Sequence, residues 1–560
     1  MRELYNRLKS MPVLFLQVLL SSLFISMLSL SSALFVIQVL TRYCTHGVDT
    51  TLITLTIGVL IAIAVEFGFR QVRLGLARGF SIRPDAQMAG GAFATLTSGK
   101  TASIEQLPTG LRREIMNSLA AVQQAYSPSN LATVLDAFFA FLYIGALFLL
   151  NATIAVIVSF FLVVMFLFAL ASHNLLGKPT QELNQASVRN SSLVSSAIQA
   201  ADSIRSFNAA NFLKQAWGKQ QALTDELRRR ISTQQGLSQS ITMSASAIMS
   251  VAVIAVGATY VVAGGMSVGV LIGANILASR ALAPINRFAQ LGPIFTKAQQ
   301  SLELLAKFAK LPREDTKGTA LKQYKGRLEL KDLAFMYRGS SGPLFESVSL
   351  QLAGGSILVV SGDNGSGKTT LSKLLVGLLE PTRGQIFVDG LDLRQVQLEW
   401  WRQQVIYLPQ EPTFFDGTIR ENLMTVNPEL DEPKLLQVVE RAGLKRFLDE
   451  SPQGLETPLI NGGVNLALGV RRRLALARAL TSGGMLAIFD EPAEGLDAEG
   501  IGTIFKAMNE ISNSGRTLVV CSHNPNILQG KGLRLDLNIK PVPKLVIPAP
   551  AGPDTRRTLQ

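Results

Sequence analysis

Six long apolar segments occupy the first half of the chain and are separated by polar connections. The segments are residues 13–40, 52–69, 131–150, 152–171, 241–263 and 267–281. Each of the first five is long enough to cross the hydrocarbon core of a bilayer, which takes roughly 20 helical residues. The sixth is interrupted by Gly269 and Gly273. The pattern predicts a membrane α-helical domain of six transmembrane helices.

The connections between these segments alternate in length and in charge. Those after the second and fourth segments are long and basic, whereas those after the first, third and fifth are short and nearly uncharged. The basic residues of the long connections are Arg70, Arg73, Arg78, Arg83, Arg112, Arg113, Lys178, Arg189, Arg205, Lys214, Lys219, Arg228, Arg229 and Arg230. Because basic loops remain in the cytoplasm, we expect both long connections and both termini there. Apolar residues at helical spacing in residues 193–204 predict that these connections prolong the membrane helices.

From about residue 321 the pattern changes to short β-rich runs that alternate with helical segments. The runs are RLELKDLAF, SILVVSG, GQIFVDG, MLAIFDEP and RTLVVCSHN. This alternation predicts an α/β domain with a mainly parallel sheet. We expect the membrane domain to span residues 1–318, the α/β domain residues 319–541, and a proline-rich disordered tail residues 542–560.

The composition agrees with a membrane protein. Of the 560 residues, 48% are hydrophobic and 17% are charged. Attraction to anionic membrane lipid explains the net charge of +13 better than nucleic-acid binding does, because the chain has no groove-reading or base-stacking motif. Cys44 and Cys521 lie far apart and have no metal-ligand spacing, which argues against a disulfide framework and a zinc site.

Two acidic residues, Glu66 and Asp136, lie inside apolar segments. An ionisable side chain within a membrane segment is a functional-site hypothesis. Both residues are near the expected cytoplasmic ends of their spans, and Glu66 has Arg70 four residues later as a helix partner. We therefore favour a structural interpretation at both positions.

The clearest chemical signal is a phosphate-binding loop that follows an expected strand at residues 357–361. Its residues are Gly362, Asp363, Asn364, Gly365, Ser366, Gly367, Lys368, Thr369 and Thr370. The glycines let backbone N–H groups turn towards phosphate oxygens, and the following helix directs its positive end at them. In this pattern Lys368 reaches the β- and γ-phosphates and Thr369 holds Mg²⁺.

A second motif, downstream, supports the first. The apolar strand at residues 486–489 ends in Asp490 and Glu491. A carboxylate at the first position can hold Mg²⁺ through water, and the next can act as general base for the attacking water. The two motifs together predict ATP and Mg²⁺ as the cofactors.

With these motifs in order, the chain resembles the ATP-binding cassette (ABC) family, and within it the exporters that carry six membrane helices followed by one nucleotide-binding domain. The resemblance implies that Tyr337 in FMYRG stacks on adenine, and that Gln410 in LPQEP senses Mg²⁺ and the membrane domain. It also implies that His523 in SHN contacts the γ-phosphate. Residues 415–423, FDGTIRENL, resemble the exporter segment after that glutamine, and Leu496 and Asp497 end the loop after the general base.

One segment departs from the family pattern. Members carry LSGGQ before a helix that reads RQRLALARAL, whereas residues 466–470 here read LALGV before RRRLALARAL. In the family this segment closes on the ATP of the partner chain in a head-to-tail dimer. Ala467 lacks the hydroxyl, Leu468 crowds the phosphate and Val470 lacks the amide. A charge-assisted contact is worth about 1.5–3 kcal/mol, so we expect weaker closure. Asn461–Gly462 is a second departure, because glutamate usually precedes this glycine.

Within the exporters, the membrane half resembles the type I secretion transporters of Gram-negative bacteria, which move unfolded proteins with a membrane fusion protein and an outer-membrane channel. The resemblance lies in SLFISMLSLSSALFVIQVLTR from Ser22 and GANILASRALAPINRFAQL from Gly273. Leu40 and Thr41 depart from it, since that group usually has tyrosine and aspartate there. The resemblance implies a multi-pass protein of the bacterial inner membrane. About ten residues precede the first span, which is too few for the peptidase-like domain that some relatives use on double-glycine leaders, so we do not expect this chain to cleave leader peptides.

The function that we expect is ATP-driven export of proteins or peptides as the ABC subunit of a type I secretion system. Two alternatives remain: an exporter of lipids or small molecules, and a regulatory subunit that binds ATP but barely hydrolyses it. The altered LALGV segment favours the regulatory subunit, whereas Lys368, Asp490, Glu491 and His523 argue against it. The working unit is expected to be a dimer through the nucleotide-binding domains. It is either a homodimer, the rule in the resembled group, or a heterodimer with a half-transporter that has an intact LSGGQ.

Overall fold

The computed structural model describes residues 2–315, 317–528 and 532–546. The chain divides into two units after Pro312, and residues 100–102 group with the second unit. This division falls close to the boundary expected at residue 318. Each unit has its own secondary-structure class, helical in the first and α/β in the second.

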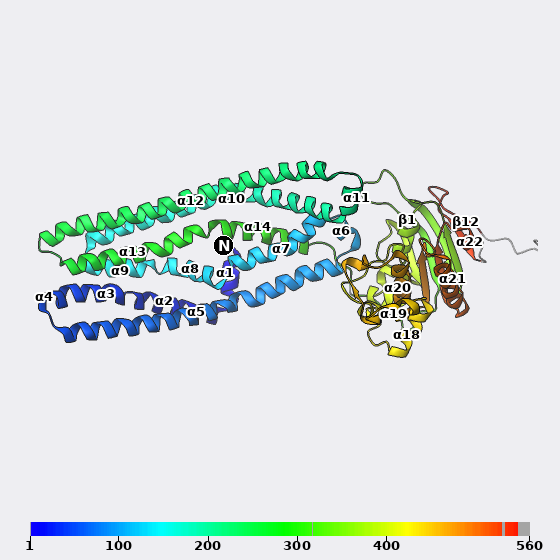
Figure 1. Ribbon diagram of the computed structural model, residues 1–560, viewed down its shortest axis with the longest axis horizontal. Helices are drawn as coiled ribbons and strands as arrows, with labels where there is room; N and C mark the ends of the chain where they lie inside the picture. The colour runs from blue at the N-terminus through cyan, green and yellow to red at the C-terminus, as the bar shows by residue number, and fades with distance from the viewer. Residues whose placement is uncertain (1, 316, 529–531, 547–560) are drawn as a thin grey trace, which may run out of the picture. The chain divides into compact units, whose positions relative to one another are not determined.

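The first unit consists of helices (Figure 1). They are α1 (Arg2–Lys9), α2 (Pro12–Ser29), α3 (Ser31–Gln38), a π-helical turn (Val39–Tyr43), α4 (Cys44–His46), α5 (Asp49–Ser98), α6 (Thr101–Glu105), α7 (Thr109–Ala125), α8 (Pro128–Phe138), α9 (Ala140–Leu150), α10 (Ala152–Gln199), α11 (Ala201–Ser206), α12 (Ala210–Val262), α13 (Val268–Gln290) and α14 (Gly292–Ala309). Within the described residues, six helical stretches are long and apolar enough to span a membrane. The six predicted spans are confirmed, including the sixth, which begins at Val268.

Three helices extend far beyond their apolar segments. α5, α10 and α12 contain 50, 48 and 53 residues, and α10 and α12 pack side by side (Figure 1). At 1.5 Å per residue each is about 75 Å long, whereas the hydrocarbon core of a bilayer is about 30 Å thick. The prediction that the long connections prolong the membrane helices is therefore confirmed.

Both acidic residues of the apolar segments have basic partners. Glu66 forms an ion pair with Arg70 one turn later on α5, as predicted. Asp136 on α8 pairs with Arg73 on α5, a partner that the sequence did not indicate. Arg73 is 7% exposed and also donates a hydrogen bond to Ser22 on α2, so this charge pair joins three helices of the unit.

The second unit contains two main sheets. The larger has the order β12-β11-β3-β10-β9-β6 and is parallel except for the β11–β12 pair. Its strands are β3 (Ile357–Ser361), β6 (Val405–Leu408), β9 (Leu486–Asp490), β10 (Thr517–Cys521), β11 (Leu533–Asp536) and β12 (Lys544–Val546). The smaller sheet, which the sequence did not predict, is antiparallel and contains β2 (Phe345–Leu352), β1 (Leu328–Phe335), β4 (Arg383–Val388) and β5 (Leu391–Asp392) in that order. A two-stranded pair joins β7 (Gly417–Thr418) to β8 (Pro458–Leu459).

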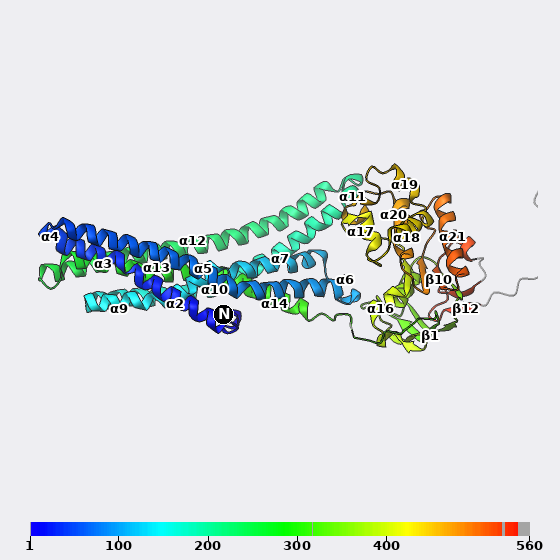
Figure 2. The same cartoon turned by 90° about the horizontal axis from the view of Figure 1, so that it is seen from below.

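Helices cover the sheets of the second unit. They are α15 (Lys368–Leu375), α16 (Leu398–Gln403), α17 (Ile419–Met424), α18 (Glu432–Arg441), α19 (Lys445–Glu450), α20 (Leu468–Leu480), α21 (Ala498–Asn513) and α22 (Pro525–Leu528), with 3₁₀ turns at Leu393–Gln395, Gly454–Glu456 and Asn461–Gly463. α17 and α18 both pack against α20, and the three gather on the side of the unit away from β1 (Figure 2).

The central strands of the larger sheet are apolar on both faces. Every residue of β9 is buried; Leu486 and Ile488 join one hydrophobic cluster, and Ala487 and Phe489 join the other. A continuous apolar run is typical of a parallel strand with helices on both faces. This packing fixes the carboxyl end of β9, where Asp490 lies.

The end of the described chain differs from the prediction. β12, at Lys544–Val546, pairs with β11 and so belongs to the larger sheet, although the predicted tail begins at residue 542. β12 is the edge strand of this sheet and pairs through its backbone despite the neighbouring prolines. The remainder of the predicted tail, residues 547–560, lies outside the described residues.

Candidate active site

The loop between β3 and α15 has the backbone that its glycines allow. Gly365 and Gly367 have φ angles of +82° and +114°, which residues with a Cβ rarely adopt. A Cβ on Gly367 would also lie 3.0 Å from a side-chain carbon of Leu344. The loop turns directly into α15, which begins at Lys368. Free N–H groups at this helix end favour an anion.

Lys368 is held by three acceptors. Its Nζ lies 2.6 Å from the carbonyl oxygen of Gly362, 3.1 Å from that of Asp363 and 3.1 Å from Oε1 of Glu491. The side chain is 6% exposed. The lysine therefore presents a nearly buried positive charge between the loop and the end of β9.

Three oxygen-bearing side chains next to Lys368 fit a divalent cation. The hydroxyl of Thr369 donates to Oε1 of Gln410 over 3.1 Å. Both carboxylate oxygens of Asp490 are buried and have no hydrogen-bond partner among the described residues. Burial raises the pKa of Asp490 to about 6. A cation beside this carboxylate would favour its charged form, and a hydroxyl, an amide oxygen and a carboxylate are ligands that Mg²⁺ accepts.

Glu491 lies at the centre of the polar contacts. It is 3% exposed, with a φ of +46°, and its N–H donates to the carbonyl oxygen of Cys521 over 2.8 Å. Its Oε1 is 2.9 Å from Nδ1 of His523, and its Oε2 accepts a hydrogen bond from the hydroxyl of Ser522. Burial raises the pKa of Glu491, but the hydrogen bond with His523 and the contacts with Lys368 outweigh it, so the pKa lies below its ordinary value. The carboxylate is therefore charged at neutral pH and able to accept a proton.

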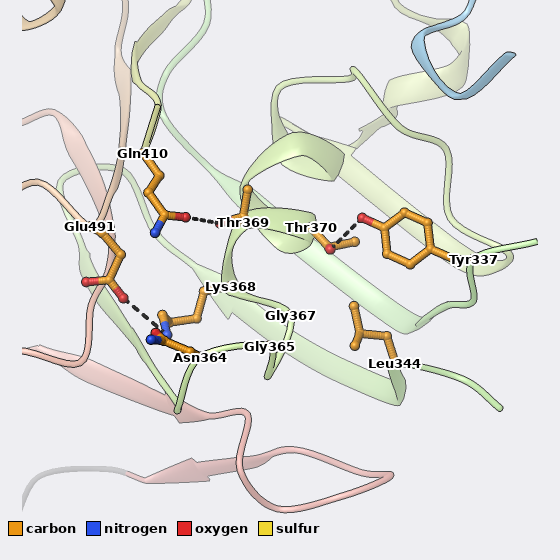
Figure 3. Close-up of a pocket in the computed structure, with 10 residues that line it drawn as sticks. All are labelled: Tyr337, Leu344, Asn364, Gly365, Gly367, Lys368, Thr369, Thr370, Gln410 and Glu491. Carbon is orange, nitrogen blue, oxygen red and sulfur yellow. Dashed lines mark hydrogen bonds and ion pairs between the residues drawn. The ribbon is translucent and has the colours of Figure 1, made fainter. Parts of the chain in front are cut away.

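Tyr337 forms the opposite wall of the same pocket (Figure 3). Its hydroxyl is 2.9 Å from the hydroxyl of Thr370, and its ring packs edge-on against Phe335 with centroids 4.8 Å apart. The side chain remains 46% exposed. An exposed aromatic face at the rim of a phosphate-binding pocket can stack on a base.

Most of the predicted site residues line this single pocket. They are Tyr337, Asn364, Gly365, Gly367, Lys368, Thr369, Thr370, Gln410 and Glu491, together with Leu344, which the sequence did not indicate (Figure 3). The other predicted residues lie around it. Gly362 and Asp363 offer carbonyl oxygens to Lys368, and the N–H of Ser366 donates to the carbonyl oxygen of Asp363. His523 contacts Oε1 of Glu491, the same oxygen that Lys368 contacts.

Comparison with known proteins assigns this arrangement to a family. The sequence model described as ABC transporter transmembrane region matches residues 14–283, and the one described as ABC transporter matches residues 345–494. The chain belongs to the ABC transporter family. It is a multi-pass membrane protein whose ATPase activity is coupled to transport, as the resemblance predicted.

Relatives of this ABC transporter include secretion proteins. The chain is 25% identical to the toxin RTX-I translocation ATP-binding protein of Actinobacillus pleuropneumoniae and 26% identical to the leukotoxin translocation ATP-binding protein LktB of Mannheimia haemolytica. Each alignment covers 511 residues, 91% of this chain and 72% of the relative. The fold matches a bacterial Atm1-family ABC exporter solved with ATP bound, with a TM-score of 0.79, 18% identity and 94% of each chain covered. The transporter therefore has the exporter architecture.

Two residues that support the phosphate loop of this ABC transporter were missed in the sequence. Lys540 donates to the carbonyl oxygens of Ser366, at 2.6 Å, and of Leu344. The side-chain oxygen of Asn538 accepts a hydrogen bond from the N–H of Asp363 over 2.8 Å. Both follow β11 in a stretch without a motif, so only the fold brings them to the loop.

The LALGV segment of the ABC transporter has a defined local structure. Ala467 is the N-cap of α20 and forms no side-chain cap hydrogen bond. Leu468 is 44% exposed. Its side chain lies over Gly495, where an added Cβ would come within 3.1 Å of its Cδ2. Leu466 and Val470 are partly buried against one of the two hydrophobic clusters. Of the substituted side chains, Val470 therefore packs within this chain, whereas Ala467 and Leu468 are exposed, and Leu468 is the larger apolar group.

Proposed function

We propose that the pocket binds ATP with Mg²⁺ and that Glu491 is the general base of hydrolysis. Lys368 would neutralise the β- and γ-phosphates, and Tyr337 would stack on the adenine. Thr369, Gln410 and Asp490 would hold the metal ion, which would draw charge from the phosphate oxygens. Glu491 would take the proton of the attacking water, and His523 would bind the γ-phosphate. The buried, hydrogen-bonded and charged carboxylate of Glu491 is the observation that carries this assignment.

The cargo that we propose is an unfolded protein or peptide, exported as in type I secretion. Support comes from the two relatives named for toxin translocation, which align over 91% of the chain. The chain would then lie in the bacterial inner membrane with its ATP-binding unit in the cytoplasm. A membrane fusion protein and an outer-membrane channel would complete the export path. A lipid or small-molecule cargo is the alternative.

We further propose that the working unit is a heterodimer with a half-transporter that has an intact LSGGQ. In such a pair the intact signature would close on the ATP held by Lys368 and Glu491. The other composite site would use LALGV, where Leu468 obstructs close approach and Ala467 offers no hydroxyl. The transporter would then have one active site and one impaired site.

The cargo proposal is tested by comparing the proteins and lipids released by cells with and without the gene. Loss of one or more secreted proteins, restored by the wild-type gene but not by a Glu491→Gln variant, is the expected result. If the released proteins are the same and only lipids or small molecules change, the exporter has the alternative cargo. If neither changes although the transporter is expressed, export by this chain is not supported.

A further inference from the structure

Glu494 is a third carboxylate next to the proposed metal-binding side chains, and none of the motifs above accounts for it. It lies in the turn after β9, where its N–H donates to the carbonyl oxygen of Glu491 over 3.2 Å. Its Oε2 accepts a hydrogen bond from Nε2 of Gln410 over 3.1 Å and lies 3.4 Å from Nη2 of Arg472. The one carboxylate therefore joins two side chains from distant parts of the sequence.

The contact with Gln410 fixes which end of the amide faces the phosphate loop. A carboxylate can only accept hydrogen bonds, so the NH₂ group of Gln410 must face Glu494. The amide oxygen is then left on the opposite side, where it accepts from the hydroxyl of Thr369 over 3.1 Å. Without Glu494, the amide of Gln410 could rotate and turn its NH₂ group towards Thr369, and an NH₂ group cannot bind a metal ion.

Arg472 holds Glu494 in place from α20. Its Nη1 donates to the carbonyl oxygen of Glu491 over 3.2 Å, and its side chain is only 11% exposed, compared with 43% for Glu494. The resembled helix pattern RQRLALARAL has glutamine at this position, which lacks the positive charge. The arginine thus anchors both the general base and Glu494 to the helix that begins in the LALGV segment.

We propose that Glu494 is a positioning residue that orients the Gln410 amide towards Mg²⁺ and links that amide, through Arg472, to α20 of the same chain. This inference rests on the proposed role of Gln410. Its consequence is that a shift of α20 alters the metal site built on this chain's own phosphate loop. Partners of metal ligands commonly change metal affinity by about 10- to 100-fold when removed.

The test measures the affinity of the full-length protein for a fluorescent ATP analogue, with Mg²⁺ and with EDTA. The ratio of the two affinities is the gain due to Mg²⁺. Glu494→Ala should reduce this gain by about tenfold. Affinity in EDTA should stay close to wild type, which also shows that the variant is folded. Glu499→Ala is the matched control, because Glu499 on α21 is 71% exposed and lies 3.8 Å from Arg473, the neighbour of Arg472 on α20. The gain of this variant should equal that of wild type.

A charge reversal separates orientation of Gln410 from simple pairing with Arg472. The variant Glu494→Lys with Arg472→Glu keeps an ion pair, but the lysine donates hydrogen bonds and would turn the amide oxygen of Gln410 away from Thr369. The gain should therefore stay as low as in Glu494→Ala. Recovery of the gain would overturn the proposal, as would an unchanged gain in Glu494→Ala. Glu494→Gln, which can accept or donate, should be intermediate and serves if the reversal does not fold.

Gln410→Ala tells this inference apart from the proposed function. If Gln410→Ala lowers the gain and Glu494→Ala does not, only the positioning role fails. If Gln410→Ala leaves the gain unchanged, Gln410 is not a metal ligand. The proposed metal-binding role of Gln410 and the positioning role of Glu494 then fail together.

Discussion

Replacing Glu491 with glutamine should separate ATP binding from hydrolysis. Glutamine keeps the size of the side chain but accepts a proton far less readily, so turnover at the site built on this chain should fall by about a hundredfold or more. A hundredfold loss corresponds to about 2.7 kcal/mol of transition-state stabilisation. The hydroxyl of Ser522, 3.2 Å from the carboxylate, can still donate to the new amide oxygen, so the fold should be kept.

The same change should strengthen ATP binding. Lys368 now contacts a charged oxygen of Glu491 at 3.1 Å, and a phosphate oxygen that binds Lys368 must compete with it. A charge-assisted hydrogen bond is roughly twice as strong as a neutral one, so the glutamine should relieve about 1 to 1.5 kcal/mol of this competition. The affinity for ATP should therefore rise by about five- to twelvefold.

Two assays on the purified transporter with its partners test these expectations. Phosphate release gives turnover, and titration with a fluorescent ATP analogue gives affinity. Glu510→Gln is the matched control, since Glu510 pairs with Arg441 on the surface and should leave both quantities unchanged. Turnover of Glu491→Gln within about threefold of wild type would refute the general-base role. A fall in ATP affinity would refute the competition between Glu491 and phosphate for Lys368.

Three further outcomes are expected. Changing Ala467→Ser, Leu468→Gly and Val470→Gln together should strengthen ATP-driven association of the two ATP-binding domains, which cross-linking measures. Single changes should do little, because Leu468 obstructs the other contacts. The chain purified alone should hydrolyse ATP far more slowly than when mixed with a half-transporter that has an intact LSGGQ, as phosphate release will show. Asp136→Ala should lower stability by about 3 kcal/mol, since Arg73 would keep a buried charge without its partner, and thermal unfolding in detergent measures this.

Each of these outcomes has a control or a contrary result. An unchanged ATPase rate and unchanged association after the triple change would mean that LALGV does not limit closure. A homodimer of the chain alone with an exporter-like ATPase rate would exclude the need for a second half-transporter. Asp225→Ala removes an exposed carboxylate that accepts only from Gln221 in the described structure, and should leave the unfolding temperature unchanged.

Features that depend on neighbouring residues were readable in the sequence. The length of each apolar segment is enough to predict a span, because crossing a bilayer requires a fixed number of helical residues. The phosphate loop was readable for a similar reason: the strand at residues 357–361 and the helix from Lys368 are adjacent to the glycines that need positive φ. The ion pair between Glu66 and Arg70 also lies within one helical turn.

Local patterns gave less information about sheet edges. The sequence predicted a mainly parallel sheet, but not the separate antiparallel sheet that holds β1 and β4. Strand propensity identifies extended segments but not their partners, because pairing depends on contacts across the fold. The prolines near residue 542 likewise predicted a tail, although β12 gains its hydrogen bonds from β11.

The sequence by itself thus determined the six spans, the ATP-binding motifs and the altered LALGV segment. Tertiary structure decided which polar groups meet: Asp136 with Arg73, Lys540 with the carbonyl oxygens of the phosphate loop, and Glu494 with the amide of Gln410. In each case the partners are separated by dozens to hundreds of residues and occupy different elements. No local pattern records such a contact, because the energy that selects it comes from packing the elements together.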